Sequence, residues 1–217
     1  MKNLIILGGS GIGMIACSVA NDLGTYNIVG FLNDVLPVGT KVGKYNKIPV
    51  IGTTSDIEKY INDENNLFFI AYVGMQNEED VYKKIESLNI PNHRFATLIH
   101  PSSIIPKGFC KIGNGVLMSP LTQLSPDTTI EDNCILLPNS FVGHDSTLRK
   151  FAHIASNAVV GANVNVGRGV HVGTNATIRE KVKIGDFSLI GSGSVVLNDV
   201  EPNSIVVGNP ARLLRKK

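Results

Sequence analysis

Two adjacent residues of this chain, His144 and Asp145, have side chains that suit acid–base chemistry at neutral pH. An imidazole can take a proton from an amine or hydroxyl group as that group attacks an electrophile. The pair lies in the segment SFVGHD, at a turn that follows the apolar Val142. The pair is therefore a candidate general base, although for a histidine considered by itself a solvated polar turn is the simpler interpretation.

A repeat of six residues must position this pair. From Ile112 to Val196, every sixth residue is aliphatic or methionine, fifteen times without a gap, and the residue two positions before it is always small or β-branched. A period of six fits neither a helix nor a simple alternating strand. It predicts a parallel β-helix in which three hexapeptides close one coil. A β-sandwich, the alternative, would need antiparallel hairpins and variable strand spacing.

Residues eighteen positions apart should therefore lie above one another, at about 4.8 Å. His153 and His171 are such a pair, and we expect both to point outward from the same face of neighbouring coils. An ordinary outward residue is the simpler interpretation of His153. Cys110 and Cys134 hold inward corner positions of the repeat, so we expect them in the core and not as nucleophiles.

The N-terminal part of the chain has a different pattern, in which short apolar segments alternate with helical ones. This order predicts a small parallel sheet with a Gly-rich turn after its first strand. We expect a helix whose N-cap is Ser55, and another helix that begins with a capping box formed by Asn77 and Asp80. The expected strands are Leu4–Leu7, Asn27–Leu32, Leu67–Val73 and Phe95–Ile99, and the first helix is Met14–Leu23.

The Gly-rich turn at residues 8–13 is a candidate phosphate cradle, because backbone N–H groups at a helix N-terminus bind anions. Its glycines do not match the dinucleotide fingerprint, and a tight turn without a ligand is an equal alternative. Asp34 follows the second strand, where ribose or base contacts are expected. The sheet is too short for two mononucleotide halves, so a single nucleotide or a nucleotide sugar fits better.

Composition limits the remaining possibilities. The 217 residues carry a net charge of +2 without a basic block, which gives little support to nucleic acid as a partner. The three cysteines lack a CxxC pair or zinc-like spacing, so we expect reduced thiols in the cytoplasm and no metal. The uncharged run Leu4–Ala20 is interrupted by glycines, which argues against a signal peptide or membrane segment. We expect two domains, residues 1–103 and 104–217.

The chain resembles the bacterial hexapeptide-repeat acyltransferases that modify nucleotide-linked amino sugars or sialic acid. The matching stretches are LIILGGSGIG, FLND, FATLIHP, SFVGHD, the repeats and VVGNPAR, which span nearly the whole chain. The resemblance implies an α/β plus β-helix fold, with a small Rossmann-like N-terminal domain followed by a left-handed parallel β-helix. It also implies acetyl-CoA as co-substrate, no metal, and a homotrimer whose active sites lie between subunits.

The resemblance assigns a role to individual residues. His144 would be the general base, and Asp145 would raise its basicity. Ile12 stands where many members carry histidine, and Asn33 where some carry aspartate. The residues implied to bind acetyl-CoA are His153, Thr174, Ser192 and Pro210, and those implied to bind the nucleotide sugar are Ser10, Gly11, Ile12, Asn33, Asp34 and Gly74.

The resulting hypothesis is an enzyme that transfers the acetyl group of acetyl-CoA to the amino group of a nucleotide-linked sugar. The expected substrate is a UDP-linked 4-amino-4,6-dideoxy sugar of a polysaccharide pathway such as O-antigen synthesis. O-acetylation of sialic acid or a related sugar is the first alternative. The second is a non-catalytic β-helix scaffold that binds a nucleotide sugar, although such a scaffold has no need of His144 at a turn.

Overall fold

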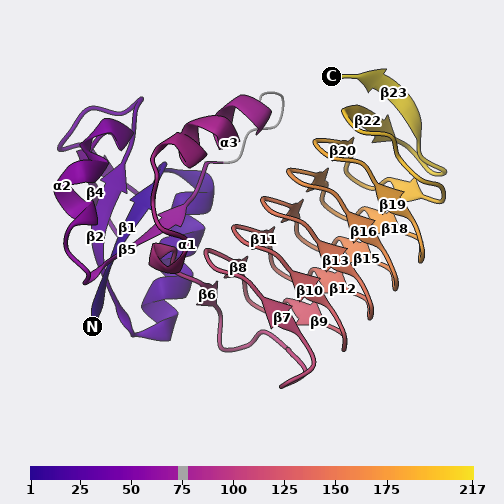
Figure 1. Ribbon diagram of the computed structural model, residues 1–217, viewed down its shortest axis with the longest axis horizontal. Helices are drawn as coiled ribbons and strands as arrows, with labels where there is room; N and C mark the ends of the chain where they lie inside the picture. Colours follow the sequence, from indigo (N-terminus) through magenta and orange to yellow (C-terminus); the bar gives the residue numbers. More distant parts are fainter. Residues whose placement is uncertain (73–77) are drawn as a thin grey trace. The chain divides into compact units, whose positions relative to one another are not determined.

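The computed structural model describes residues 1–72 and 78–217 (Figure 1). The chain divides into two compact units, Met1–Leu98 and Ile99–Lys217. Each unit has its own hydrophobic core, and each is considered separately below. Gly74, which the resemblance assigns to the nucleotide sugar, and Asn77, the expected start of a capping box, lie outside the described residues.

The N-terminal unit is built on a five-stranded sheet of order β3-β4-β2-β1-β5. The pairs β1–β2, β1–β5 and β2–β4 are parallel, whereas β3 runs antiparallel to β4. Neither β3 nor β4 is among the strands predicted from the sequence. The elements are β1 Lys2–Leu7, α1 Gly11–Leu23, β2 Tyr26–Leu32, β3 Lys41–Val42, β4 Ile48–Gly52, η1 Thr54–Ile57, α2 Glu58–Ile61, β5 Asn66–Ile70, α3 Glu78–Ser87 and η2 Asn92–Arg94.

Three local expectations are wrong, and one of them is the strand Phe95–Ile99, which is formed only at Leu98–Ile99 as β6. The N-cap of the short helical segment is Thr53 and not Ser55, because Thr53 and Asp56 form a capping box. The carboxylate of Asp56 accepts a hydrogen bond from the Thr53 backbone N–H at 2.8 Å, which satisfies a donor that the first turn leaves free. The strand expected to end at Val73 ends at Ile70.

The C-terminal unit is a parallel β-helix whose fifteen two-residue strands recur every six residues (Figure 1). The strands lie on three sides, which we name the β7 side, the β8 side and the β9 side after their first repeat strands. The β7 side holds β7 Lys111–Ile112, β10 Thr129–Ile130, β13 Thr147–Leu148, β16 Asn165–Val166 and β19 Lys183–Ile184. The β8 side holds β6 Leu98–Ile99, β8 Leu117–Met118, β11 Ile135–Leu136, β14 His153–Ile154, β17 His171–Val172, β20 Leu189–Ile190, β22 Ser204–Val207 and β23 Arg212–Lys216. The β9 side holds β9 Gln123–Leu124, β12 Phe141–Val142, β15 Val159–Val160, β18 Thr177–Ile178 and β21 Val195–Val196.

The second residue of each repeat strand points inward and forms the core. On the β8 side, Met118, Leu136, Ile154, Val172 and Ile190 are all fully buried. Each strand pairs in parallel with the strand eighteen residues later, as the pairing of β14 with β17 illustrates. The expected eighteen-residue coil is therefore confirmed, and its stability comes from aliphatic side chains stacked along the axis.

The corners between the sides use the left-handed backbone conformation. At the corner between the β9 and β7 sides, Asp127, Asp145 and Asn163 have φ of 62°, 58° and 57°. Asparagine and aspartate tolerate this conformation better than other residues with a side chain. Aspartate and asparagine can therefore replace one another at these corners without a change of backbone.

Candidate functional site

His144 and Asp145 lie at the corner between the β9 and β7 sides, where β12 ends. His144 Nδ1 is 2.6 Å from Asp145 Oδ2, and the two side chains are 57% and 52% exposed. A carboxylate can only accept a hydrogen bond here, so Nδ1 carries the proton and Nε2 presents its lone pair. The pair thus has the geometry of an oriented general base that is open to a substrate.

The backbone fixes this corner from both neighbouring coils. The N–H of Asp145 donates to the carbonyl of Pro126 at 3.3 Å, and the carbonyl of His144 accepts from Asn163 N–H at 2.8 Å. The preceding residue, Gly143, leaves room for this stacking, because a Cβ atom there would lie 2.6 Å from the backbone nitrogen of Ala162. The position of His144 is therefore set by coil stacking as well as by its own turn.

His153 and His171 lie side by side on the β8 side, in the register that the repeat predicts. Their rings pack edge to face with centroids 4.4 Å apart. Both residues are buried, at 7% and 9% exposure, although they point away from the β-helix core. Neither ring nitrogen of His153 has a hydrogen-bond partner among the described residues. Burial, together with the charge of His171, lowers the pKa of His153 to about 3, so this ring is neutral at pH 7.

This burial makes the stability of the protein depend on pH. Between pH 6.5 and 3 the unfolded chain binds a proton at His153 that the folded chain does not. The free energy of unfolding should therefore fall as the pH falls through this window, by up to about 1.4 kcal/mol per pH unit. Urea unfolding of the wild type and of His153→Leu between pH 7 and 4 measures the effect.

Leucine is the matched replacement because Leu117 and Leu189 hold the same position of the repeat on the β8 side. For His153→Leu we expect the free energy of unfolding to change less with pH, because this variant lacks the one proton that the wild type takes up at residue 153 on unfolding. A change at the exposed His93, His93→Gln, should leave the wild-type slope. Equal slopes for the wild type and His153→Leu would contradict a neutral buried His153.

The other residues assigned to acetyl-CoA lie in later coils. Thr174 and Ser192 are exposed and occupy equivalent positions one coil apart, where the Thr174 carbonyl accepts from Gly193 N–H at 2.8 Å. They lie at the corner between the β8 and β9 sides. Pro210 is exposed between β22 and β23. Within one chain these residues and His144 are thus at different corners, separated by a strand of the β9 side.

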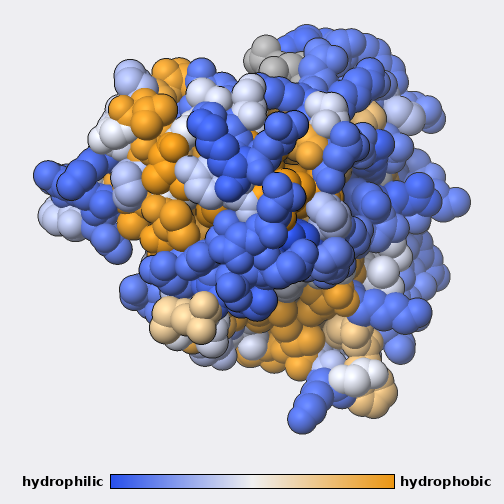
Figure 2. Space-filling view, turned by 60° about the vertical axis from the view of Figure 1, so that its left-hand side comes forward, coloured by the Kyte–Doolittle hydropathy of each residue, from blue (hydrophilic) through white to orange (hydrophobic). Residues whose placement is uncertain are grey.

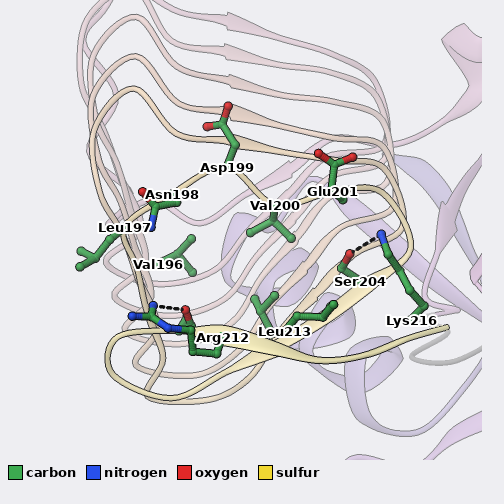
Figure 3. A pocket seen from close by; sticks show the side chains of 12 residues that line it. Val196, Leu197, Asn198, Asp199, Val200, Glu201, Ser204, Arg212, Leu213 and Lys216 are labelled. Carbon is green, nitrogen blue, oxygen red and sulfur yellow. Dashed lines mark hydrogen bonds between the residues drawn. The ribbon is translucent and has the colours of Figure 1, made fainter.

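A cavity of about 340 Å³ lies at the C-terminal end of the β-helix, beside the β22–β23 hairpin (Figure 3). Its lining combines two carboxylates, Asp199 and Glu201, with the cations Arg212 and Lys216. Lys216 Nζ already donates to the Ser204 hydroxyl and to a backbone carbonyl, each at 3.0 Å. Lys216 is thus already held by hydrogen bonds within the fold. The negative charges of Asp199 and Glu201 disfavour the binding of an anion in this cavity.

In the N-terminal unit, the Gly-rich turn joins β1 to α1. Ser10 has φ 59° at the N-cap of α1, and its hydroxyl makes no capping hydrogen bond. Asn33 follows β2 and accepts hydrogen bonds from the N–H groups of Val35 and Leu36 at 2.9 and 2.7 Å. The turn packs closely on Asn33, because a Cβ atom at Gly9 would lie 2.8 Å from Asn33 Nδ2. Among the predicted residues the structure brings Ser10, Gly11, Ile12, Asn33 and Asp34 to this carboxyl edge of the sheet.

Asp34 lies in a cavity of about 330 Å³, whose lining is completed by Val35, Thr54, Tyr72, Asp80, Val81, Lys84, Ile85 and Leu88. Its carboxylate accepts from Lys84 Nζ at 2.6 Å, from the N–H and hydroxyl of Thr54, and from Tyr72 at 3.3 Å. Burial raises the pKa of Asp34, but the hydrogen bonds from Lys84 and Thr54 outweigh it and hold that pKa below its ordinary value. Burial and the charge of Asp34 raise the pKa of Tyr72 to about 12.

Sequence reasoning missed Thr54, Tyr72 and Lys84. They lie 20 to 50 positions after Asp34 in the chain, and no motif connects them to it. Val35, at the mouth of the same cavity, is 86% exposed. On the face drawn in Figure 2, hydrophobic residues form patches within a largely hydrophilic surface. A mixed apolar and charged cavity at the carboxyl ends of parallel strands is the usual place for a ligand in such a sheet.

Several other groups have no direct role in this chemistry. The thiols of Cys17, Cys110 and Cys134 are free, and burial raises the pKa of each. Cys134 is buried in the core as expected, whereas Cys110 is only partly buried and packs against it. Among residues 1–72 and 78–217, no cluster of histidine, cysteine or acidic side chains could hold a metal ion. In that same part of the chain, every helix is too short or too polar to cross a membrane.

Comparison with known proteins gives both units a match. Residues 3–85 match the PglD N-terminal domain, and residues 163–198 match the bacterial transferase hexapeptide of six repeats. None of the curated proteins compared matches the chain.

Solved structures match the whole chain. The acetyltransferase domain of PglB from Neisseria gonorrhoeae is 27% identical with a TM-score of 0.85, over 99% of this chain and 100% of that one. The same domain is solved in complex with acetyl coenzyme A. Perosamine N-acetyltransferase from Caulobacter crescentus, in complex with CoA and GDP-perosamine, has a TM-score of 0.85 at 19% identity, over 100% and 98% of the chains. WeeI from Acinetobacter baumannii reaches 0.79 at 23% identity, over 99% and 100%.

A Rossmann-like unit followed by a left-handed β-helix of hexapeptide repeats, with a histidine–carboxylate pair exposed at a corner, defines a hexapeptide-repeat acyltransferase. The two family-model matches and the 27% identity to the gonococcal acetyltransferase domain agree with the predicted family of bacterial sugar acyltransferases that carry a PglD-type N-terminal domain. The predicted family and fold class are confirmed, as is the enzyme class of acetyl-CoA-dependent sugar N-acetyltransferases.

Proposed function

We propose that this protein transfers the acetyl group of acetyl-CoA to the 4-amino group of a nucleotide-linked 4-amino-4,6-dideoxy sugar, with UDP as the nucleotide. The observation that carries the proposal is the exposed His144–Asp145 pair, held at 2.6 Å with Nε2 open to a substrate. The match to the gonococcal acetyltransferase domain over the whole chain supports the same activity.

In the proposed mechanism His144 acts as the general base. The amine attacks the thioester carbonyl carbon as His144 Nε2 removes its proton, so a C–N bond forms and the carbonyl becomes an oxyanion. The C–S bond then breaks, and the CoA thiolate takes the proton from the imidazolium. Asp145 holds Nδ1–H and stabilises the charge that His144 carries between these steps.

The nucleotide part of the substrate would bind the N-terminal unit. Ser10, Gly11 and Ile12 lie at the N-terminus of α1, where backbone N–H groups and the helix dipole favour a phosphate. The cavity around Asp34, with Asn33 at the same edge, would hold the nucleoside. Because Asp34 is occupied by Thr54, Tyr72 and Lys84, we assign it the role of holding Lys84 over this cavity.

Acetyl-CoA would bind along the later coils, in contact with His153, Thr174, Ser192 and Pro210. The buried nitrogens of His153 support this role, because a polar group without a protein partner is costly unless a ligand supplies one. His144 lies at a different corner from Thr174 and Ser192. We therefore propose a homotrimer in which one chain provides His144 and its neighbour provides the CoA groove.

The test is a thiol-release assay with acetyl-CoA and a panel of acceptors. The panel contains UDP-, GDP- and dTDP-linked 4-amino-4,6-dideoxy sugars and free sialic acids. We expect turnover with the nucleotide amino sugars and the highest kcat/KM with the UDP-linked one. Turnover with a sialic acid alone would replace N-acetylation by O-acetylation. Absence of turnover with every acceptor would contradict the proposed function.

A further inference from the structure

A small cavity lies on the first two coils of the β-helix, directly beside the His144 corner. It encloses about 290 Å³ and is lined by residues 108–111 and 127–129. Phe109, Asp127 and Asp145 are spaced by eighteen residues and hold equivalent places in three successive coils. The N–H of Asp127 donates to the Phe109 carbonyl at 2.7 Å, and the N–H of Asp145 donates to the Pro126 carbonyl. The cavity and the histidine pair are therefore neighbours on one corner of one chain.

The lining of this cavity offers the groups that bind a sugar ring. The ring of Phe109 is 61% exposed, which is unusual for so large an apolar side chain. Asp127 and Lys111 are exposed beside it, and Thr129 is partly exposed. Within the described part of the chain, neither the carboxylate of Asp127 nor the ammonium of Lys111 makes a hydrogen bond or ion pair. A pyranose can place its C–H face on an aromatic ring and its hydroxyls on a carboxylate and an ammonium group.

The proposed acetyl-CoA site does not occupy the side of His144 that faces the earlier coils. The proposed acetyl-CoA contacts His153, Thr174, Ser192 and Pro210 all come later in the chain than His144, so they belong to the same or later coils. The cavity lies in the earlier coils. An acceptor held in the cavity would approach His144 from the side opposite to the body of CoA, as transfer between the two requires.

We propose that this cavity holds the amino-sugar ring of the acceptor, with Phe109 under the ring and with Asp127 and Lys111 on its hydroxyl groups. The proposal rests on the acetyltransferase function proposed above. At about 290 Å³ the cavity is slightly smaller than the roughly 300–1,000 Å³ of sites for whole small-molecule ligands. It therefore suits one sugar ring, while the nucleotide binds elsewhere.

Three single variants and one matched control test the assignment. Phe109→Ala removes the ring, Lys111→Met removes the charge, and Asp127→Asn removes the carboxylate while keeping a residue that suits the left-handed corner. The control is Lys183→Met, because Lys183 holds the same position as Lys111 on the β7 side, four coils further on. All four positions are exposed, so the variants should fold normally.

Three constants are measured for each enzyme: the KM of the amino-sugar nucleotide, the KM of acetyl-CoA, and the Ki of the parent nucleoside diphosphate as a competitive inhibitor. We expect each cavity variant to raise the sugar-nucleotide KM about tenfold. The acetyl-CoA KM and the nucleotide Ki should stay within about twofold of the wild-type values, because neither ligand contains the amino-sugar ring. Lys183→Met should match the wild type in all three.

An unchanged sugar-nucleotide KM in the cavity variants, with an active wild type, would overturn the subsite and leave the proposed function intact. An equal rise in the nucleotide Ki would also overturn it, since the cavity would then hold the nucleotide and not the ring. A wild type that acetylates no nucleotide amino sugar would instead refute the proposed function.

Discussion

His144→Ala is expected to lower the kcat of acetyl transfer at least a hundredfold, the range over which a positioned general base contributes. The amine acceptor is mostly protonated at neutral pH, so attack on the thioester depends on removal of its proton. The carboxylate of Asp145 lies on the Nδ1 side of the ring at 2.6 Å and not at Nε2, where the amine would be, so we do not expect it to replace the imidazole. Steady-state rates with saturating acetyl-CoA and amino-sugar nucleotide measure the effect.

Two further variants test whether the loss of kcat is specific to the imidazole of His144. His144 is 57% exposed, so its removal should leave the free energy of unfolding within about 0.5 kcal/mol of wild type. Asp145→Asn keeps a residue that accepts the left-handed corner, and we expect it to lower kcat by a smaller factor, about tenfold. His93→Ala, a change at an exposed histidine of the N-terminal unit, should leave kcat unchanged. Near-normal kcat in His144→Ala would remove this residue from the role of base.

Two inactive variants should restore activity when they assemble together. His144→Ala lacks the base, and Ser192→Trp places a bulky side chain at the exposed corner assigned to CoA. If each site takes His144 from one chain and the CoA groove from another, a mixed trimer contains sites with both parts intact. Random assembly of equal amounts should leave about a quarter of all sites intact, and the mixed trimers retained on both tags should have about one intact site in three. Co-expression with two different affinity tags, followed by purification on both, measures this recovery.

The control is a double variant that carries both changes on one chain, mixed with His144→Ala. This mixture contains no intact His144 on any chain and should stay inactive. Doubly tagged mixed oligomers without recovered activity would contradict the shared site. A stable monomer in sedimentation would contradict the trimer itself.

The β-helix could be predicted from sequence almost strand by strand. The reason is physical: each coil must place an aliphatic side chain on the one below, so Ile112 to Val196 keep an unbroken period. The N-terminal sheet was predicted less completely. β3 has only two residues, and the apolar sequence IPVIG of β4 contains a proline, which disfavours a strand, so β4 is recognisable chiefly through its pairing with β2.

The candidate site could likewise be predicted from the sequence only in part. The repeat predicts that His153 points away from the core, and its register with His171 is as expected. It does not predict that the ring is buried, because the period gives the direction of a side chain and not what covers it. Likewise the motif FLND indicates Asp34, but its partners Thr54 and Lys84 come together only when the sheet and α3 fold.

Because the coils are equally spaced, the number of coils sets the distance between two points along the β-helix axis. Each coil adds about 4.8 Å along the axis, so the number of coils after His144 fixes how far the His144 corner lies from the C-terminal hairpin. Removing the eighteen residues of one coil would preserve every stacking rule and yet shorten this distance by one step. The number of coils therefore sets the length of surface available to an extended ligand that spans the later coils. The regular aliphatic repeat thus affects ligand binding as well as stability.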